Sequence, residues 1–447
     1  METVFCFRER QRFKYQLISR IRCTARIHCA KVLGYGLLAF YSRQYEGEPS
    51  LTLFFTLIGW VTLLTVGVYA YYLHNKDMEL SVGRLIFWAV LFRGCGLLGV
   101  PLFEDDFYRY LWDGYRFAEA GTPYGIPPAQ FFTDTTITHI FQRILEHVNY
   151  PDIPTIYGPT TQYAFLVGYF LKAREVLPLQ LIFVLFDLLL IWLLLAIVPA
   201  RLVLLYAWCP LVIKEIAFTA HPDGFGVCLL IAAVILQQRN QLNGAAVFLA
   251  LSVGAKVFAL LLVPFMLARA GLRHWLIFMM TLLLLYLPFW LQGGTEMIAL
   301  SVFAQAWEFN SAIFGVLTVW LSSFTAKLVL GFAFLSFLAW YYLHYRLPSS
   351  EKIPRGDWIY GLFLIIAPTI NAWYLLWMLP FAVIYPSWWA WTASVAVFLS
   401  YITGLNLDNL TLGTYEQPFW VRPLEFGLIF IALCYDIYRR RWKKAKF

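Results

Sequence analysis

The stretch LTLFFTLIGWVTLLTVGVYAYYLH, residues 51–74, decides the fold class of this chain. It contains no Asp, Glu, Lys or Arg, and it is long enough to cross a hydrocarbon core of roughly 30 Å as a helix. The bilayer core offers no water to hydrogen-bond an open backbone, so a spanning segment is a helix or part of a closed barrel. Alternating strands of the barrel type are absent from the sequence. We therefore predict an all-α membrane protein.

Further apolar windows extend this prediction along the chain, which is 61% hydrophobic and only 13% charged. Long windows lie at 82–102, 179–199, 274–291, 327–345, 387–405 and 424–438. Shorter or broken pieces, typical of half-spans beside a cavity, lie at 157–171, 202–218, 224–237, 243–268, 312–323 and 358–385. We expect a polytopic bundle of about 11–13 transmembrane or partial helices.

The two ends carry much of the net charge of +8. We divide the chain into a basic N-terminal segment (1–49), a membrane domain (50–440) and a basic tail (439–447). Basic flanks of membrane helices favour the cytoplasmic side and anionic lipid, so we expect lipid contact and no nucleic acid. No cleavable signal peptide is visible. The seven cysteines avoid the polar loops that carry the motifs below, so we expect neither a structural disulfide nor a metal cluster.

The longest polar segment, 103–156, is expected on the extracytoplasmic face. Counting back from a cytoplasmic tail also places 292–311, 369–373 and 406–423 on that face. The basic N-terminal segment does not fit this count unless it re-enters the membrane. Within 103–156 the stretches TPYGIPP and NYPDIP break helices, so we predict short interfacial helices joined by turns.

An acidic triplet, Glu104 to Asp106, opens this segment. If residues 103–117 form a helix, Asp106, Arg109 and Asp113 share one face. A charged, solvated helix with a weak Asp–Arg pair would explain the pattern without any function. Crowded carboxylates, however, raise one another's pKa and suit proton abstraction or the binding of a divalent cation such as Mg²⁺ or Mn²⁺, while a nearby Arg keeps one acid ionised. The triplet is therefore a candidate general base.

The motif EDDFYRYLWDG (104–114) resembles a signature in the first extracytoplasmic loop of bacterial membrane glycosyltransferases of the GT-C superfamily. The nearest resemblance is to polyprenyl-phosphate-mannose-dependent mannosyltransferases. Similar motifs follow in the order of that family: GTPYG, NYPDIPTIYGPTTQ, AWCPLVIKEIAFTAHPDGFGV, GAKVFALLLVP, WEFNSAIFGVL and INAWYLLWMLPF. The resemblance covers about residues 50 to 440 and implies a GT-C-like bundle.

The chain departs from the family pattern at five positions. Thr122, Cys209 and Pro222 stand where the family has Asn, Gly158 where it has Pro, and Asn371 where it has His. All but Cys209 lie in or beside the presumed substrate cleft, so the departures leave the sugar and the acceptor open.

The resemblance implies an inverting transfer of a mannose-like hexose from a polyprenyl-phosphate donor to a hydroxyl of a glycan, glycolipid or protein. It places the enzyme in a bacterial inner membrane, facing the periplasm or exterior, in envelope glycan or glycolipid synthesis. Asp106 would be the base, with Asp105 as the alternative. The donor phosphate would be bound by Lys256, Arg109 and Arg93. The sugar or acceptor would be bound by Glu104, Asp113, Tyr124, Tyr157, His221, Asp223, Asn310, Asn371, Trp373 and Tyr374.

Several of these residues have a simpler structural explanation. Arg93 and Lys256 lie in apolar runs, and each could instead pair with Asp187 or Glu215 to hold the fold. His221 could be a hydrogen-bonded core residue. The chain has no second His at zinc-ligand spacing from His221, so a zinc site is not expected.

Two other functions compete with the enzyme. In a transporter or flippase, Arg93, Lys256 and the broken helices would form a midplane site and the acidic loop would be dispensable. The matching halves typical of such proteins are not visible. A polymerase or ligase of the O-antigen type would need large later loops, and the later loops here are short.

Overall fold

The computed structural model describes residues 24–44, 50–75, 79–347, 351–409 and 411–444. Helix accounts for 72% of the structure, and no strand occurs within these ranges. This confirms the predicted all-α class. The basic residues at positions 8 to 22 and the last three residues of the predicted tail lie outside the described ranges.

The helices follow one another closely. Residues 24–44 are helical. The later elements are α2 (Leu51–His74), α3 (Val82–Leu97), α4 (Asp106–Ala120), η1 (Pro128–Phe131), α5 (His139–Glu146), α6 (Pro159–Lys172), α7 (Leu177–Leu195), α8 (Ala200–Ala207), α9 (Pro210–Ile213), η2 (Lys214–Phe218), α10 (Asp223–Gln238), α11 (Leu242–Ala255), η3 (Val257–Leu262), α12 (Val263–Met266), α13 (Leu272–Leu291), α14 (Met297–Ala306), α15 (Ile313–Leu317), α16 (Ser323–Tyr345), α17 (Gly356–Ile366), η4 (Ala372–Trp377), α18 (Leu379–Ile384), α19 (Trp388–Ala396), η5 (Val397–Tyr401) and α20 (Val421–Lys444).

Four of the described helices are long and apolar enough to cross a membrane: α2, α7, α13 and α16. The pair Pro210–Phe218 and Asp223–Gln238 also passes this test, but the pair is bent by 115° at its break. The broken segment predicted around residues 202–237 is therefore observed. The window at 387–405 is shorter than expected, because α19 ends at Ala396 and a 3-10 helix ends at Tyr401.

Helix boundaries follow local chemistry. Ser50, Ser81 and Ser322 precede α2, α3 and α16, and each side chain accepts a hydrogen bond from a backbone N–H of the first turn. Helix α4 ends at Ala120 and is capped by Gly121, whose φ of 72° suits glycine. Its start is later than the expected residue 103, since Asp106 is its first residue.

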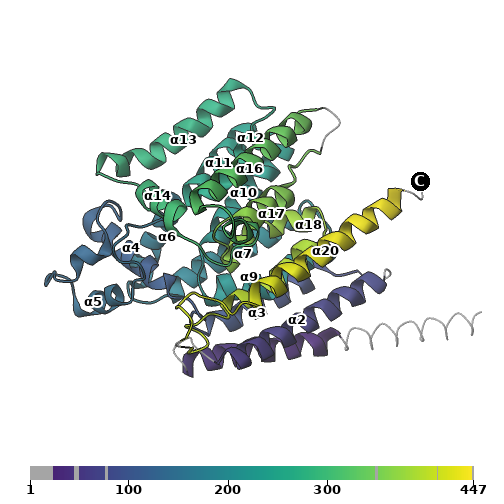
Figure 1. Ribbon diagram of the computed structural model, residues 1–447, viewed down its shortest axis with the longest axis horizontal. Helices are drawn as coiled ribbons and strands as arrows, with labels where there is room; N and C mark the ends of the chain where they lie inside the picture. Colours follow the sequence, from purple (N-terminus) through teal and green to yellow (C-terminus); the bar gives the residue numbers. More distant parts are fainter. Residues whose placement is uncertain (1–23, 45–49, 76–78, 348–350, 410, 445–447) are drawn as a thin grey trace, which may run out of the picture.

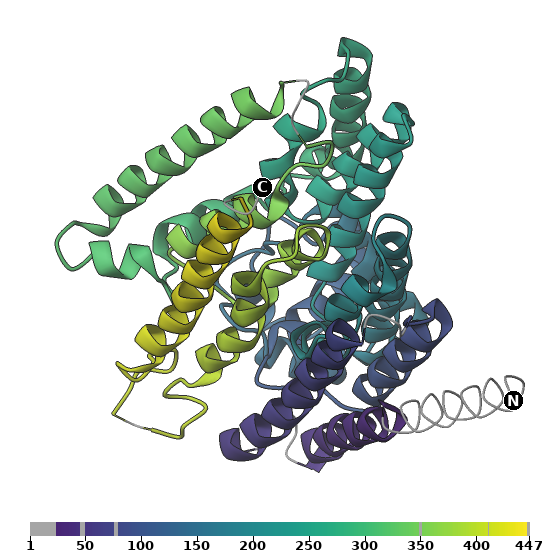
Figure 2. The same ribbon diagram turned by 90° about the vertical axis from the view of Figure 1, so that its right-hand side faces the viewer.

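The core lies around α7, α10 and α11, whereas α13 and α16 are mostly exposed. Helix α10 packs against both α7 and α11, and nearly all its side chains are buried. In the most apolar windows of α13 and α16 only 11% and 17% of the residues are buried. Figures 1 and 2 show α13 at one edge of the molecule and α2 at the opposite edge. The exposed apolar faces of α13 and α16 are suited to contact lipid tails.

Residues 24–44, within the predicted basic N-terminal segment, form a helix that lies beside α2 (Figure 2). Gly34 is so close to α2 that an added Cβ would be 2.6 Å from Val61 Cγ1. Lys31 belongs to this helix. Its side chain is buried, and its Nζ lies over the rings of Phe92 and Trp208. This helix was not predicted from the sequence, and it is not among the described helices that are long and apolar enough to cross a membrane.

The short helices predicted within 103–156 are present as α4, η1 and α5, and their place at a membrane interface stays a prediction. They lie at the left-hand end in Figure 1, and the C-terminal end of α20 lies at the right. Residues from the loops 292–311, 369–373 and 406–423 line the same cavity as the acidic triplet. The loops that the charge count placed on one face are thus brought together.

Candidate active site

The acidic triplet and Lys256 line one cavity of about 1140 Å³. One part of its wall is polar and comes from the start of α4, residues 149–158 and the break at Lys256. Another part is apolar and comes from α14, α16 and α17. A single space therefore joins carboxylates, a cation and a hydrophobic wall.

Asp105 and Asp106 are held by one amide. Asn149 Nδ2 donates to Asp105 Oδ1 at 2.7 Å and to Asp106 Oδ1 at 3.0 Å. Tyr157 OH donates to Asp106 Oδ2 at 3.3 Å. Asp106 also begins α4, where the helix dipole favours a negative charge. These donors fix the positions of both carboxylates at the edge of the cavity.

Glu104 lies deeper in the same wall. Burial raises the pKa of its carboxyl well above the usual value, and the neighbouring acids Glu215, Asp106 and Asp105 add to this against the opposing effect of Lys214. A protonated Glu104 can donate a hydrogen bond to a sugar hydroxyl, whereas Asp106 cannot do so while ionised. The triplet thus contains acids in different environments.

Arg109 lines the cavity but uses its guanidinium on the backbone. It donates to the carbonyl oxygens of Asn149 at 2.9 Å, Tyr150 at 3.0 Å and Ile153 at 3.1 Å. These bonds fix the segment that carries Asn149 against α4. The structure therefore gives Arg109 a clear positioning role, and its predicted contact with phosphate stays a prediction.

Asp113 and Tyr124, two predicted sugar contacts, lie behind the cavity wall. Asp113 accepts hydrogen bonds from Thr155 Oγ1 and, at 2.9 Å, from Gln162 Nε2. Burial raises the pKa of Asp113 to about 6. Tyr124 OH donates to the carbonyl of Tyr157 at 2.8 Å. Both side chains support the segment that ends at Tyr157, and neither lines the cavity.

Lys256 is positioned by a break and by an acid. Helix α11 ends at Ala255, and Lys256 has an extended backbone between α11 and η3. Its Nζ lies 2.7 and 2.8 Å from the two carboxylate oxygens of Asp223. Trp377 Nε1 also donates to Asp223 Oδ1, at 2.7 Å. Asp223 is buried and does not line the cavity, so it orients Lys256.

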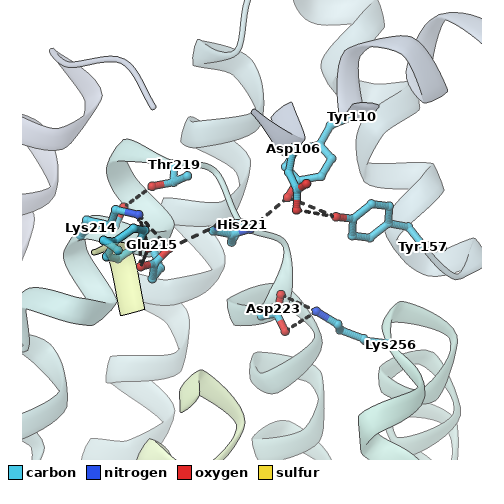
Figure 3. A network of polar contacts seen from close by, with 10 residues as sticks. Asp106, Tyr110, Tyr157, Lys214, Glu215, Thr219, His221, Asp223 and Lys256 are labelled. Atoms are coloured by element: carbon cyan, nitrogen blue, oxygen red, sulfur yellow. Dashed lines mark hydrogen bonds and ion pairs between the residues drawn. The ribbon is translucent and has the colours of Figure 1, made fainter. Parts of the chain in front are cut away.

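His221, a predicted sugar contact, also lies behind the wall. Its ring stacks on Trp373 with centroids 4.0 Å apart, and Trp373, Tyr374 and Asn371 line the cavity. Figure 3 shows His221 between Tyr110 on one side and Glu215 on the other. From the sequence, Glu215 was considered only as a fold-holding partner of Arg93 or Lys256, and Lys214, which lies next to Glu215 in this structure, was not singled out.

Asn310 and Arg93 lie outside this cavity. Asn310 is buried, and its Nδ2 donates to both carboxylate oxygens of Glu425 at 3.1 and 3.2 Å. Arg93 forms a buried ion pair with Asp187 and donates to the carbonyl of Ala207 at 2.8 Å. Arg93 therefore ties α3 to α7 and α8, which was the structural alternative.

Glu296 is a cavity residue that the sequence reasoning missed. It is 4% exposed, and its Oε1 accepts from Tyr286 OH at 2.6 Å. Its Oε2 has no hydrogen-bond partner within the described part of the chain. Burial raises the pKa of Glu296. An acid directly after a span, as in the opening triplet, was the available signal.

The sequence left open a Mg²⁺ or Mn²⁺ ion at the acidic motif, and this stays a hypothesis. Within the described ranges, no group of three or more His, Cys, Asp or Glu side chains is arranged to hold a metal ion. The cysteines described, at 29, 95, 209, 228 and 434, are unpaired thiols.

We compared the sequence of the chain with models of known protein families. Residues 28–271, more than half of the chain, match the MptA_B family, described as "Alpha-(1->6)-mannopyranosyltransferase, N-terminal domain". No curated protein and no solved structure gave a match. The matched segment contains the acidic triplet, Tyr157, the broken helix and Lys256. The chain therefore belongs to the MptA_B family of mannosyltransferases and is a glycosyltransferase enzyme.

Proposed function

We propose that the chain transfers mannose from a polyprenyl-phosphate donor to an acceptor hydroxyl, with inversion at the anomeric carbon. The observation that carries this proposal is the shared cavity, in which the carboxylates of Asp105 and Asp106, the cation of Lys256 and an apolar wall face one space. Each part fits one part of the reaction. The acids suit the acceptor, the cation suits the phosphate and the apolar wall suits a lipid chain.

The apolar wall supports a lipid-borne donor. Its side chains include Leu300, Phe303, Leu330, Phe334 and Ile366. Helix α16, which contributes to this wall, presents most of its surface outward. A lipid tail along this wall would pass from the bilayer to the cavity without crossing water, and each buried CH₂ contributes about 0.8 kcal/mol.

Asp106 would take the proton from the acceptor hydroxyl. The acceptor oxygen then attacks the anomeric carbon from the face opposite the phosphate, a C–O bond forms, and the bond from that carbon to the phosphate oxygen breaks. The leaving group is polyprenyl phosphate. Lys256 directs two N–H groups at Asp223 and has a third for a phosphate oxygen, where charge grows during bond breaking. Asp105 is the alternative base.

The linkage follows from the family name and from inversion. An α-(1→6) product requires a β-linked mannosyl donor and the C6 hydroxyl of a hexose acceptor. This narrows the proposed acceptor to a glycan or glycoconjugate that carries a hexose with a free C6 hydroxyl. We place the reaction on the outer face of a bacterial inner membrane, in envelope glycan synthesis, because the loop charge count puts the acidic segment there.

The test compares Asp106→Asn and Asp105→Asn in purified protein with polyprenyl-phosphate β-mannose and an α-mannoside acceptor. Loss of a general base costs roughly 10²- to 10⁴-fold in rate, so one variant should lose that much while it still binds donor. Asp134→Asn is the matched control, since this acid lies in the same segment and bonds Thr136 away from the cavity. Parental rates in both test variants would show that the acidic triplet is not the base and would contradict the proposed mechanism.

A further inference from the structure

Three aromatic rings from distant parts of the sequence meet at the substrate cavity. Tyr150 lies in the acidic segment, Trp307 directly follows α14, and Tyr415 lies in the loop before α20. The rings of Tyr150 and Trp307 are arranged edge to face, with centroids 4.3 Å apart. The ring of Tyr415 is inclined by only 26° to that of Tyr150, with centroids 6.3 Å apart. We call these three residues the aromatic platform.

The aromatic platform is accessible to a ligand. All three residues line the cavity. Tyr150 and Tyr415 are 41% and 47% exposed, and Trp307 is partly exposed. Tyr157 lines the same cavity but is only 8% exposed. A large ring that serves only to fill a core would be expected to be mostly buried, so the platform presents ring surface that a bound molecule can cover.

The backbone at Tyr150 is strained. Its φ is 47°, in a region that a bulky side chain rarely adopts. The contacts of its carbonyl oxygen hold this conformation, since that oxygen accepts from Arg109 Nη2 at 3.0 Å and from the backbone N–H of Ile153 at 3.1 Å. Glycine or asparagine would adopt the same φ with less strain. A ring retained at such a position points to a function of the ring itself.

The same turn connects the aromatic platform to the candidate base. Asn149, which donates to both Asp105 and Asp106, directly precedes Tyr150. Burial and the nearby charges of these two acids raise the pKa of Tyr150 and of Tyr415. The platform therefore lies within electrostatic reach of the carboxylates, and a group bound on it would be a neighbour of the hydroxyl that reacts.

The chemistry of the aromatic platform suits a carbohydrate better than a lipid chain. A pyranose ring has a face of C–H groups that packs on an aromatic ring, and hydroxyls at its rim that bond polar neighbours. The platform has such neighbours, because Asp105 is exposed beside it and Glu308 follows Trp307 in the cavity lining. A hydrocarbon chain in the same place would remove water from these acids without replacing its hydrogen bonds.

We propose that the aromatic platform binds the second and further sugar units of an acceptor glycan, while the hexose whose C6 hydroxyl reacts lies at Asp106. This inference rests on the proposed function, which supplies the class of acceptor. The platform residues then determine specificity and do not touch the reacting atoms. An acceptor of several hexose units would bind more tightly than a single hexose.

The test uses purified protein, polyprenyl-phosphate β-mannose and two acceptors, methyl α-mannoside and an α-(1→6)-linked mannotrioside. The parent should have a lower KM for the trioside than for the methyl mannoside. Trp307→Ala and Tyr415→Ala should each raise the KM for the trioside by about tenfold, because each removes a ring contact. The KM for methyl mannoside, the KM for donor and kcat should stay parental.

Two further variants separate ring contacts from general damage. Phe419→Ala is the matched control for Tyr415→Ala, because Phe419 lies in the same loop and is 92% exposed but does not line the cavity. Its KM for the trioside should stay parental. Tyr415→Phe keeps the ring and should also keep the parental KM. Melting temperatures of all variants in one detergent check that each is folded.

Calorimetric titration of the trioside without donor gives a second readout that needs no turnover. Trp307→Ala and Tyr415→Ala should weaken this binding by the same factor of about ten as they raise the KM. Because no sugar is transferred in this titration, the result does not depend on which residue is the base.

Three outcomes would overturn the inference. A raised donor KM with an unchanged trioside KM would mean that the rings contact the lipid. Equal losses with both acceptors would mean a general structural role. A parent that does not distinguish the two acceptors would mean that no second sugar unit is bound. The proposed base is tested separately by Asp106→Asn with methyl mannoside, an acceptor too short to reach the platform, so the two proposals can fail independently.

Discussion

At the scale of single residues, Lys256 depends on its acid partner. Removing the ammonium alone leaves Asp223 buried with one remaining donor, Trp377, and an uncompensated buried charge costs roughly 3–5 kcal/mol. A poorly folded Lys256→Met variant would therefore say nothing about phosphate binding. The double variant Lys256→Met with Asp223→Asn removes both charges and keeps both shapes.

We predict that this double variant folds and binds polyprenyl-phosphate mannose at least about tenfold more weakly, because a charge-assisted contact to phosphate contributes about 1.5–3 kcal/mol. The measurement is donor affinity in purified protein. Lys327→Met is the control, since Lys327 lines the same cavity and donates to the carbonyl of Gln305 at 2.6 Å. If Lys327→Met weakened donor binding more than the double variant did, the phosphate would be placed at Lys327.

Asp113 predicts a pH dependence of stability. Its folded-state pKa is raised to about 6, above the usual value of 3.8 for an Asp side chain, mainly because burial disfavours the charged carboxylate. Below pH 3.8 Asp113 is protonated in both the folded and the unfolded state, so no charged carboxylate is buried and the stability of the fold is not reduced. Between pH 3.8 and 6 the unfolded state loses its proton first, so the free energy of unfolding falls as pH rises.

Asp113→Asn should remove this dependence, since the amide oxygen can still accept from Thr155 and Gln162 but does not titrate. We expect the melting temperature of the variant to exceed that of the parent above pH 6 and to approach it near pH 4. Thermal unfolding in one detergent at several pH values measures this. A constant difference at all pH values would mean that Asp113 does not titrate in this range.

At the scale of elements, α6 and α11 approach closely at the substrate cavity. Gly158, where the related family has proline, precedes α6, and an added Cβ there would lie 2.3 Å from the carbonyl oxygen of Gly254. Its φ of −74° is open to any residue, so the requirement is steric. Because Tyr157 and Lys256 flank this contact and both line the cavity, the two glycines set the distance between Tyr157 and Lys256.

Gly158→Ala should therefore separate α6 from α11. Overpacking of this kind costs roughly 1–3 kcal/mol, and we expect both a lower melting temperature and reduced mannose transfer. Gly67→Ala in α2 is the control, because an added Cβ there has no atom within 4 Å. Normal activity in Gly158→Ala would show that the close approach is not needed for catalysis.

At the scale of the whole molecule, the sequence predicted the helical class, the broken spans and the acidic loop, because apolar length and helix-breaking residues are local signals. It did not predict the helix at 24–44, where Arg26, His28 and Lys31 resemble a basic flank. Burial of Lys31 against Phe92 and Trp208 is a tertiary effect that composition cannot reveal.

The sequence also predicted part of the candidate site. The acids at 104–106 and Lys256 were identified from their chemistry and their motifs. Which ions pair was not, because Arg93 had two possible acids in the sequence and the fold chose Asp187. Asn149 was missed because the carboxylates it contacts lie more than 40 residues away in the sequence, and Glu215 was considered only as a fold-holding partner of Arg93 or Lys256.

Because residues of the segments 103–156 and 406–423 line one cavity, both segments must lie on the same side of the membrane. Gln130 and Glu416 are exposed residues on segments that the charge count places on the same outer face. In a variant without exposed cysteines, Gln130→Cys and Glu416→Cys should both react with an impermeant thiol reagent added to intact cells. Asn240→Cys, exposed in the loop between α10 and α11, should react only after permeabilisation. Reversed labelling of all three would put the acids inside, where a cytoplasmic donor would have to supply the sugar. Labelling of Gln130 and Glu416 from different sides would contradict the cavity that other residues of their two segments line together.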